Sequence, residues 1–453
     1  MRLKQKKTWL IISGIVVLAA IVLALPPVWS RVSYYSRDAY TSFKYWLHPP
    51  AQAVFVPSNS EEDPVVETAV AATLTASAPT PQPAVSITTA PTSTTPEPTP
   101  LPTITPTPLP VSAYLPGVIS EPQLWNNCGP ATLSMYLSYY KWGLTQKEAA
   151  AVLRPNDRDK NTMPYEMINF VNENTAQRAL WRYGGDLATI KSLINAGFPV
   201  MVETGFEPAN LKNEGWMGHY LLLVGYDDNH QLFTTQDAYL LIHPPEGGDP
   251  IPEEERENFR GFEVPYSEIL EDWRAFNYVF LVVYPPDKQN DVLNALGPLA
   301  TDETANKIAY NRAVNEATTL SDIRERFFAW FNAGTSAVYL QDYVTAATHF
   351  DTAFSLYPDV PEANRPWRMM WYQTGPYFAY YYAGRYNDVI ELANQTLKAM
   401  SEPVLEESYY WRAMASYALG NTNKAVVDLR QSIDFHPGFA PSMAMLNQLG
   451  VTP

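Results

Sequence analysis

The chain has almost no cysteine: Cys128 is the only one among 453 residues. A single thiol excludes an internal disulfide framework, and the scattered histidines lack the spacing of a metal site. Basic residues are also in deficit, since 31 Lys and Arg face 47 Asp and Glu, for a formal net charge of -16. Nucleic-acid binding needs a basic face, so we expect no nucleic-acid partner. There is no glycine-rich phosphate loop, and the sequence predicts no cofactor.

The length and the uneven composition divide the chain into segments. A chain of 453 residues is too long for one ordinary hydrophobic core. We expect a membrane anchor or signal segment at 1–30, a juxtamembrane aromatic segment at 31–56, a Pro/Thr/Ser-rich disordered linker at 57–110, a first folded domain at 111–286 and helical repeats at 300–453.

The N-terminus carries basic residues followed by an uncharged run from Trp9 to Leu25. This run is just long enough to cross a bilayer as a transmembrane helix, and the basic flank favours a cytoplasmic N-terminus. A cleavable signal peptide is the alternative, although Pro26 and the length of the apolar core favour an uncleaved anchor. The prediction is a single-pass cell-membrane protein with its folded domains outside the cytoplasm, or a secreted protein if the segment is cleaved.

Two further segments precede the first folded domain. Aromatic and basic residues alternate after the apolar run, which suits the headgroup layer of a membrane and equally suits a short helix packed on the folded domain. The segment 57–110 is mainly Thr, Pro, Ser and Ala, and it cannot bury enough apolar surface to offset the entropy of ordering. It is expected to be an extended spacer.

Cys128 stands where a loop is predicted to become a helix. Apolar residues recur at helical spacing from Thr132 to Tyr140. Unpaired backbone N–H groups and the helix dipole at that position favour a thiolate, which is the form needed for a nucleophile. The alternative is a small buried side chain, which is the usual fate of a free cysteine.

A base for that nucleophile is offered by His219, at the start of an apolar strand predicted over 218–227. A second strand, over 231–235, follows a turn and ends just before Asp237. Antiparallel pairing of these strands brings Asp237 next to His219, where it can orient the imidazole. His230 and His243 are the rival histidines, both predicted in surface loops. Asp227 and Asp228 are the rival carboxylates, predicted to cap the hairpin turn.

Together these residues resemble the papain-like cysteine peptidases of the bacteriocin-processing, C39-like type. The resemblance lies in Gln123 to Ala131, in the strand starting at Gly218 and in Asp237, and it covers most of 111–286. It implies a Cys128–His219–Asp237 triad and an oxyanion donor at Gln123. Gln123 stands five residues before the cysteine, whereas six is the commoner spacing, so Asn126 or Asn127 remains an alternative donor.

The remaining elements of the first domain predict an α+β papain-like fold, with helices packed on an antiparallel sheet. Helices are expected at 145–153, where Thr145 and Glu148 form a capping box, at 165–173 and at 186–196, and a strand at 199–204. The loop at 243–259 is predicted to be either a solvated insertion or an acidic lid that selects basic substrates. Its glutamates are Glu253, Glu254, Glu255 and Glu257.

The last segment is predicted to be an all-α helical-repeat domain. Two sets of residues fall at the same positions of a repeat of about 34 residues and resemble tetratricopeptide repeats: Trp330, Gly334, Ala346, Phe350, Ala353 and Pro358, then Tyr409, Ala413, Ala425, Leu429, Ser432 and Pro437. A degenerate copy lies between them at 377–400. Such repeats either bind a protein partner or brace the neighbouring domain.

Two hypotheses follow from the sequence. The first is a membrane-tethered extracytoplasmic cysteine hydrolase, a peptidase acting on a peptide or protein substrate. The second is a catalytically idle surface scaffold that binds a partner through its repeats.

Overall fold

The computed structural model describes residues 26–47, 55–57, 108–156, 158–159, 161–207, 215–245, 248–400 and 402–453. Residues 1–25 of the predicted anchor or signal segment at 1–30 and nearly all of the predicted linker at 57–110 lie outside these residues, whereas 26–30 belong to helix α2 (Pro26–Leu47). Within the described residues, no helix has the length and apolar character needed to span a bilayer.

The first folded unit is built on a seven-stranded sheet in which all paired strands are antiparallel. The strand order is β2-β7-β3-β4-β5-β6, and β1 pairs with the far end of β4. The strands are β1 (Ser112–Tyr114), β2 (Arg178–Arg182), β3 (Val200–Phe206), β4 (Met217–Asp227), β5 (Leu232–Gln236), β6 (Phe262–Pro265) and β7 (Phe280–Tyr284). The longest strand, β4, is central and carries the predicted histidine.

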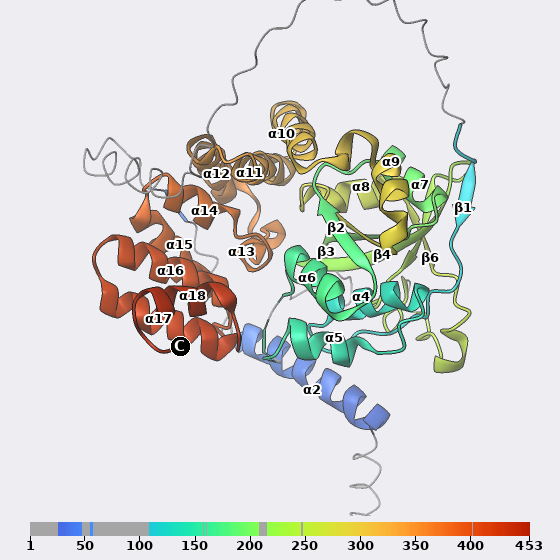
Figure 1. Cartoon of the computed structure of the whole chain (residues 1–453), viewed down its shortest axis with the longest axis horizontal. Helices are drawn as coiled ribbons and strands as arrows, with labels where there is room; N and C mark the ends of the chain where they lie inside the picture. The colour runs from blue at the N-terminus through green and yellow to red at the C-terminus, as the bar shows by residue number, and fades with distance from the viewer. Residues whose placement is uncertain are drawn as a thin grey trace, which may run out of the picture.

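Helices cover both faces of this sheet (Figure 1). One face packs on α4 (Cys128–Tyr139), α5 (Gln146–Leu153) and α6 (Pro164–Asn174), and the other on α7 (Leu187–Asn195), α8 (Tyr266–Arg274) and α9 (Gln289–Leu296). Alternate residues of β4 divide between these two cores: Leu222 faces α4, whereas Leu221 and Leu223 face α7 and α8. This period of two is the pattern of a strand buried on both sides.

The structure confirms the α+β domain with an antiparallel sheet, followed by a mostly helical region. Thr145 caps α5 and forms the predicted capping box with Glu148, and Asp186 caps α7. The expected strands at 199–204, 218–227 and 231–235 correspond to β3, β4 and β5. Strands β2, β6 and β7 lie outside the predicted ranges.

The C-terminal region consists of helices joined by short turns: α10 (Asp302–Thr319), α11 (Ile323–Tyr339), α12 (Tyr343–Leu356), α13 (Met369–Tyr372), α14 (Gly375–Tyr382), α15 (Tyr386–Ala399), α16 (Glu406–Ala418), α17 (Thr422–Phe435) and α18 (Ala440–Gln448). Three of the turns share one geometry, those between α11 and α12, α14 and α15, and α16 and α17. The middle residue of each has a positive φ: Gln341 at 64°, Gly384 at 75° and Gly420 at 80°. The backbone hydrogen bonds around these residues repeat the same pattern, which is that of a Schellman cap.

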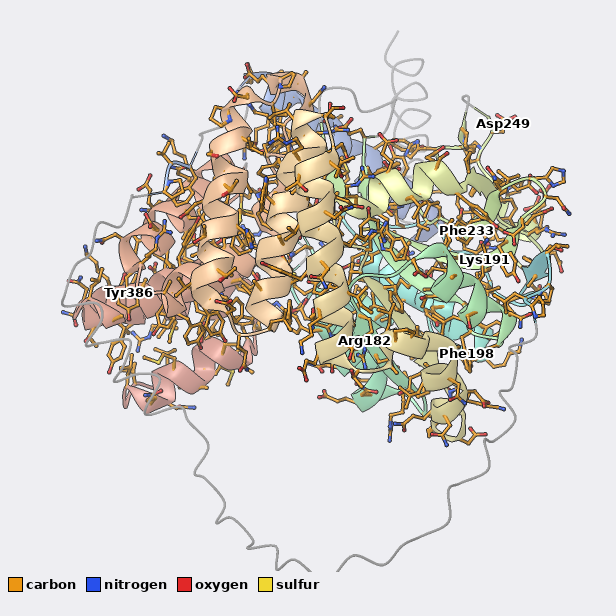
Figure 2. All side chains as sticks on the ribbon, turned by 90° about the horizontal axis from the view of Figure 1, so that it is seen from above. Arg182, Lys191, Phe198, Phe233, Asp249 and Tyr386 are labelled. Carbon is orange, nitrogen blue, oxygen red and sulfur yellow. The ribbon has the colours of Figure 1, made fainter. Side chains whose placement is uncertain are left out.

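The two units share a continuous hydrophobic core. Phe276 and Trp216 of the first unit belong to the same buried cluster as Phe331 and Phe350 of the helical region. Polar contacts join the units as well; Gln373 Nε2 donates to the carbonyl oxygen of Ala275 at 2.7 Å. Figure 2 shows Arg182 of β2 beside the first of the long helices, where its guanidinium pairs with Asp302 at 2.8 Å. The helical region is therefore packed against the first unit rather than held apart from it.

The aromatic segment after the predicted anchor forms helix α2 (Pro26–Leu47). Its C-terminal end contacts the helical region, because the buried ring of Tyr45 lies edge-on to Trp367 at 5.8 Å. Phe55 is also buried, 5.1 Å from Phe354. Other side chains of α2, among them Tyr40 and Phe43, are exposed. The segment thus packs on the folded part at one end and leaves an aromatic surface along the rest.

Candidate active site

Cys128 is the first residue of α4, as the sequence predicts. The preceding turn places Asn126 at a φ of 52°, and the buried Asn127 precedes the helix. The first backbone N–H groups of a helix have no partner within it, so the sulfur lies at the positive end of the helix dipole. The side chain is half-buried and lines a cavity, so it is not sealed in the core.

His219 and Asp237 come together across the β4–β5 hairpin. Leu222 pairs with Gln236, so Asp237 immediately follows the last paired residue of β5. His219 Nε2 lies 3.0 Å from Asp237 Oδ1, and both side chains are almost fully buried. The same carboxylate oxygen accepts backbone N–H groups from Tyr239 at 2.8 Å and Leu240 at 3.1 Å. The carboxylate is therefore fixed in place, and it fixes the ring.

The His219 imidazole also forms a hydrogen bond with the Cys128 side chain. Burial alone would raise the pKa of the thiol and lower that of the imidazole. The opposite charges prevail: the pKa of Cys128 lies below its ordinary value, and Asp237 and Cys128 raise the pKa of His219 to about 10. The favoured state of the pair is a thiolate beside an imidazolium.

Two further groups stabilise the thiolate. The backbone N–H of Tyr220 donates to the sulfur, and the guanidinium of Arg154 adds positive charge; both lower the pKa of Cys128. Arg154 is itself buried and is held by Asn127 Oδ1 at 2.9 Å and by the carbonyl oxygen of Asp159 at 2.7 Å. It is a fixed charge behind the helix N-terminus.

The thiol opens into a cavity of about 110 Å³. Residues from the helical region and from α2 line it together with those of the first unit. The lining residues are Thr41, Tyr45, Gln123, Trp125, Asn126, Cys128, Gly129, Asn161, Thr162, Glu203, Phe206, Met217, Gly218, His219, Tyr220, Tyr239, Arg368, Trp371 and Tyr372. Most of this wall is aromatic or amide, which suits a peptide chain more than a charged small molecule.

The contacts of the three candidate oxyanion donors distinguish between them. Gln123 and Asn126 both line the cavity. Asn127 does not, because its Nδ2 donates to Gln146 Oε1 at 2.7 Å and its Oδ1 accepts from Arg154. The Asn127 amide is thus bonded inside the domain, and the contacts favour Gln123 or Asn126 as the donor.

The rival residues lie elsewhere. His230 is exposed and pairs with Asp227 at 2.9 Å, and Asp228 bonds with Lys191 in the same turn region. His243 packs on the ring of Tyr239 and does not line the cavity. Of the four glutamates predicted as an acidic rim, none lines the cavity around Cys128 in the described part of the chain.

Other residues near the thiol had not been expected from the sequence. Glu203 lies within the apolar run of β3, and burial raises the pKa of its carboxyl well above the ordinary value, although its bond with Tyr220 opposes this. Burial therefore disfavours the charged form of this carboxyl beside the thiolate. The only feature of the sequence that could have indicated a role for Glu203 near the site was the presence of a carboxylate inside an apolar strand. Arg368 and Trp371 had no such signal, because they reach the cavity only through the packing of the two units.

Comparison with known proteins identifies a family for part of the chain. Residues 116–242 match the Peptidase_C39 like family, so the chain contains a C39-like peptidase domain. This family points to a cysteine peptidase with a peptide or protein as its substrate. A search among curated proteins finds no match. A solved structure described provisionally as a C39-like peptidase from Bacillus anthracis is similar over 38% of this chain and 96% of that one, with 15% identity and a TM-score of 0.28.

Proposed function

We propose that the C39-like domain is an active cysteine peptidase with Cys128 as nucleophile, His219 as general base and acid, and Asp237 as the group that orients the imidazole. One observation carries the proposal: the buried His219 is bonded to Asp237 at 3.0 Å and also to the thiol at the start of α4. A chain of hydrogen bonds from nucleophile to base to orienting carboxylate is the arrangement that supports acyl transfer to a cysteine.

The chemistry follows from the charges of the pair. The Cys128 thiolate attacks the carbonyl carbon of the scissile peptide, and the carbonyl electrons move to its oxygen. Collapse of the tetrahedral intermediate breaks the C–N bond while the His219 imidazolium gives its proton to the leaving amine. Water, deprotonated by His219, then attacks the thioester and releases the carboxylic acid and the thiol. Asp237 keeps the imidazolium stable through both steps.

The oxyanion is assigned to two donors, the backbone N–H of Cys128 and the side-chain amide of Gln123. Gln123 is supported by its place in the cavity wall and by its backbone N–H, which donates to the carbonyl oxygen of Ala238 at 3.0 Å. That bond ties the glutamine to the segment that follows Asp237. Oxyanion donor and triad are thereby linked through one short stretch of chain.

The catalytic domain is proposed to work outside the cytoplasm, tethered by residues 1–30. The basic flank and the uncharged run support this, and the contacts of Tyr45 and Phe55 with the helical region hold the folded part beside the end of the tether. Addition of an external protease to intact cells tests it: the folded domains should be degraded, whereas protection equal to that of a cytoplasmic marker would refute the topology.

The helical region is proposed to form tetratricopeptide-like repeats that brace the peptidase domain. The three equivalent turns support the repeats, and so does Gly334, where an added Cβ would lie 2.8 Å from the Phe350 ring. The shared core and the contribution of Arg368 and Trp371 to the cavity support bracing. A partner at the repeats, with an idle catalytic domain, is the alternative function.

A peptide-library digestion separates the two functions. Wild type, Cys128→Ala and a control, Ser138→Ala, are incubated with the same library and the products are identified by mass spectrometry. Cleavage by wild type and the control but not by Cys128→Ala is expected. Equal amounts of product from all three proteins would favour the scaffold. The scaffold would also be favoured if none of them gave product while Cys128→Ala still bound a protein partner.

A further inference from the structure

Four carboxylates and an imidazole, three of them buried and two partly buried, come together where the two units meet. Asp159 and Glu166 come from the first unit, and Glu406, Glu407 and His436 come from α16 and the end of α17. Asp159 and Glu406 are each 1% exposed, and Glu407 is 4% exposed. We call these five residues the junction cluster. None of them lines the Cys128 cavity.

Three members of the junction cluster have the separations of metal ligands. His436 Nδ1 lies 2.9 Å from Glu406 Oε1 and 3.7 Å from Asp159 Oδ2. One ligand atom from each of the three residues can be chosen so that all lie within 4.8 Å of one another. Zinc binds nitrogen and oxygen at about 2.0–2.2 Å, so ligands around one ion lie up to roughly 4 Å apart. A contraction of less than about 1 Å would let all three bind one ion.

A second observation points to a cation-binding site. Both carboxylate oxygens of Glu407 and Oε2 of Glu406 are buried without a hydrogen-bond partner among the described residues. Glu407 interacts electrostatically with Glu406, Glu166 and Asp159, so it faces the same cluster. A buried charge without a partner is costly, and buried carboxylates normally pair with a cation or bind a metal.

We propose that the junction cluster binds a divalent transition-metal ion of the zinc type through Asp159, Glu406 and His436 Nδ1, with Glu407 adjacent. A mixed imidazole and carboxylate set favours zinc and its neighbours, whereas calcium and magnesium take oxygen ligands alone. The ion would hold the helical region and the peptidase domain together, because its ligands come from both.

The junction cluster is also connected to the cavity wall, although the ion takes part in no catalytic step. Asp159 accepts Arg154 at its backbone carbonyl at 2.7 Å, and the nearby Asn161 and Thr162 line the cavity. Asn161 also donates to the carbonyl oxygen of Trp371, another lining residue. An ion bound at Asp159 would therefore fix the side of the cavity that joins the two units.

The test uses the full chain without a polyhistidine tag, in the Cys128→Ala background, because zinc could otherwise bind the thiol and His219. After removal of metals with a chelator, zinc is titrated by calorimetry and bound metal is measured by elemental analysis. The expected result is one equivalent of zinc, released protons and a raised Tm. His436→Gln and Glu406→Gln should each weaken binding at least ~10-fold.

His349→Gln is the matched control, since His349 is a partly buried histidine of the helical region that bonds to Tyr310 at 3.0 Å, away from the cluster. Circular dichroism verifies that each variant is folded, and Glu406→Gln provides a second test if His436→Gln does not fold. Zinc affinity equal in the control and in Glu406→Gln would overturn the proposal. The proposal would also be overturned if the Cys128→Ala protein with an intact junction cluster bound no stoichiometric zinc and showed no rise in Tm. That result would mean that protons alone neutralise the buried carboxylates.

Discussion

Replacing Asp237 by Asn removes one charge from the candidate site and little else. The Asp237 Oδ1 atom accepts the His219 ring and two backbone N–H groups, and an asparagine oxygen can occupy the same position. The shape of the side chain and the three hydrogen bonds that it accepts can therefore be retained in the variant. What disappears is the negative charge that stabilises the imidazolium and, through it, the thiolate.

The size of the effect follows from the burial of the pair. His219 and Asp237 side chains are 4% and 5% exposed, so solvent screens their interaction little. A hydrogen bond to a charged group contributes about 1.5–3 kcal/mol, which is on the order of 10- to 100-fold in an equilibrium or rate constant. Asp237→Asn should lower the pKa of His219 and raise that of Cys128. We expect the pH at which half of Cys128 is thiolate to rise by about 1–2 pH units.

Alkylation by iodoacetamide measures this directly, because Cys128 is the only thiol in the chain. The rate is followed by intact mass between pH 4 and pH 10. Wild type should react well below the ordinary thiol pKa of about 8.5, and Asp237→Asn should show a curve shifted to higher pH. Asp227→Asn is the matched control, since Asp227 bonds to the exposed His230 at 2.9 Å in the same hairpin. Identical curves for wild type and Asp237→Asn, or a wild-type thiol that titrates near 8.5, would refute the reasoning.

Three other predictions test neighbouring parts of the account. Gln123→Ala should reduce kcat by about 100- to 1000-fold with little change in KM, because an oxyanion donor acts in the transition state; steady-state kinetics in which only KM changes would contradict this. Gly185→Ala should lower the free energy of unfolding in urea by about 1–3 kcal/mol, since the new Cβ would lie 2.5 Å from the Trp273 ring, whereas Gly143→Ala meets nothing within 4 Å; equal effects would refute it. In Cys128→Ser, Asp237 still raises the pKa of His219, so the stability this confers should be fully present below about 6.5 and lost as the pH rises through the folded-state pKa; this pKa should lie below the wild-type value of about 10, because Cys128 no longer contributes to it. Urea unfolding with and without Asp237→Asn measures this loss, and parallel pH curves would contradict it.

Local signals predicted much of the first unit. The apolar spacing after Cys128 placed it at the start of a helix, and the Thr145 capping box placed the next one. The hairpin pattern was sufficient to bring Asp237 to His219, because strand pairing is local in sequence. These elements depend on residues that are close along the chain, and the periodicity of side chains records such structure directly.

Long-range packing set the limits of that prediction. Arg368 and Trp371 lie more than a hundred residues from Cys128 in the sequence, yet both line its cavity. No periodic pattern encodes a contact between two separately predicted domains. The raised pKa of Glu203 was equally hidden, since it results from burial rather than from residue type.

The central claim is that the thiol and the imidazole form one catalytic unit, and covalent trapping tests it most directly. Wild type and His219→Ala are incubated with a library of peptidyl acyloxymethyl ketones at pH 6, and intact mass identifies adducts on Cys128. The account predicts a stoichiometric adduct on wild type and at least ~100-fold slower labelling of His219→Ala, in line with the contribution of a general acid–base group. Equal labelling of the two proteins, or a wild-type thiol that no probe modifies, would contradict it.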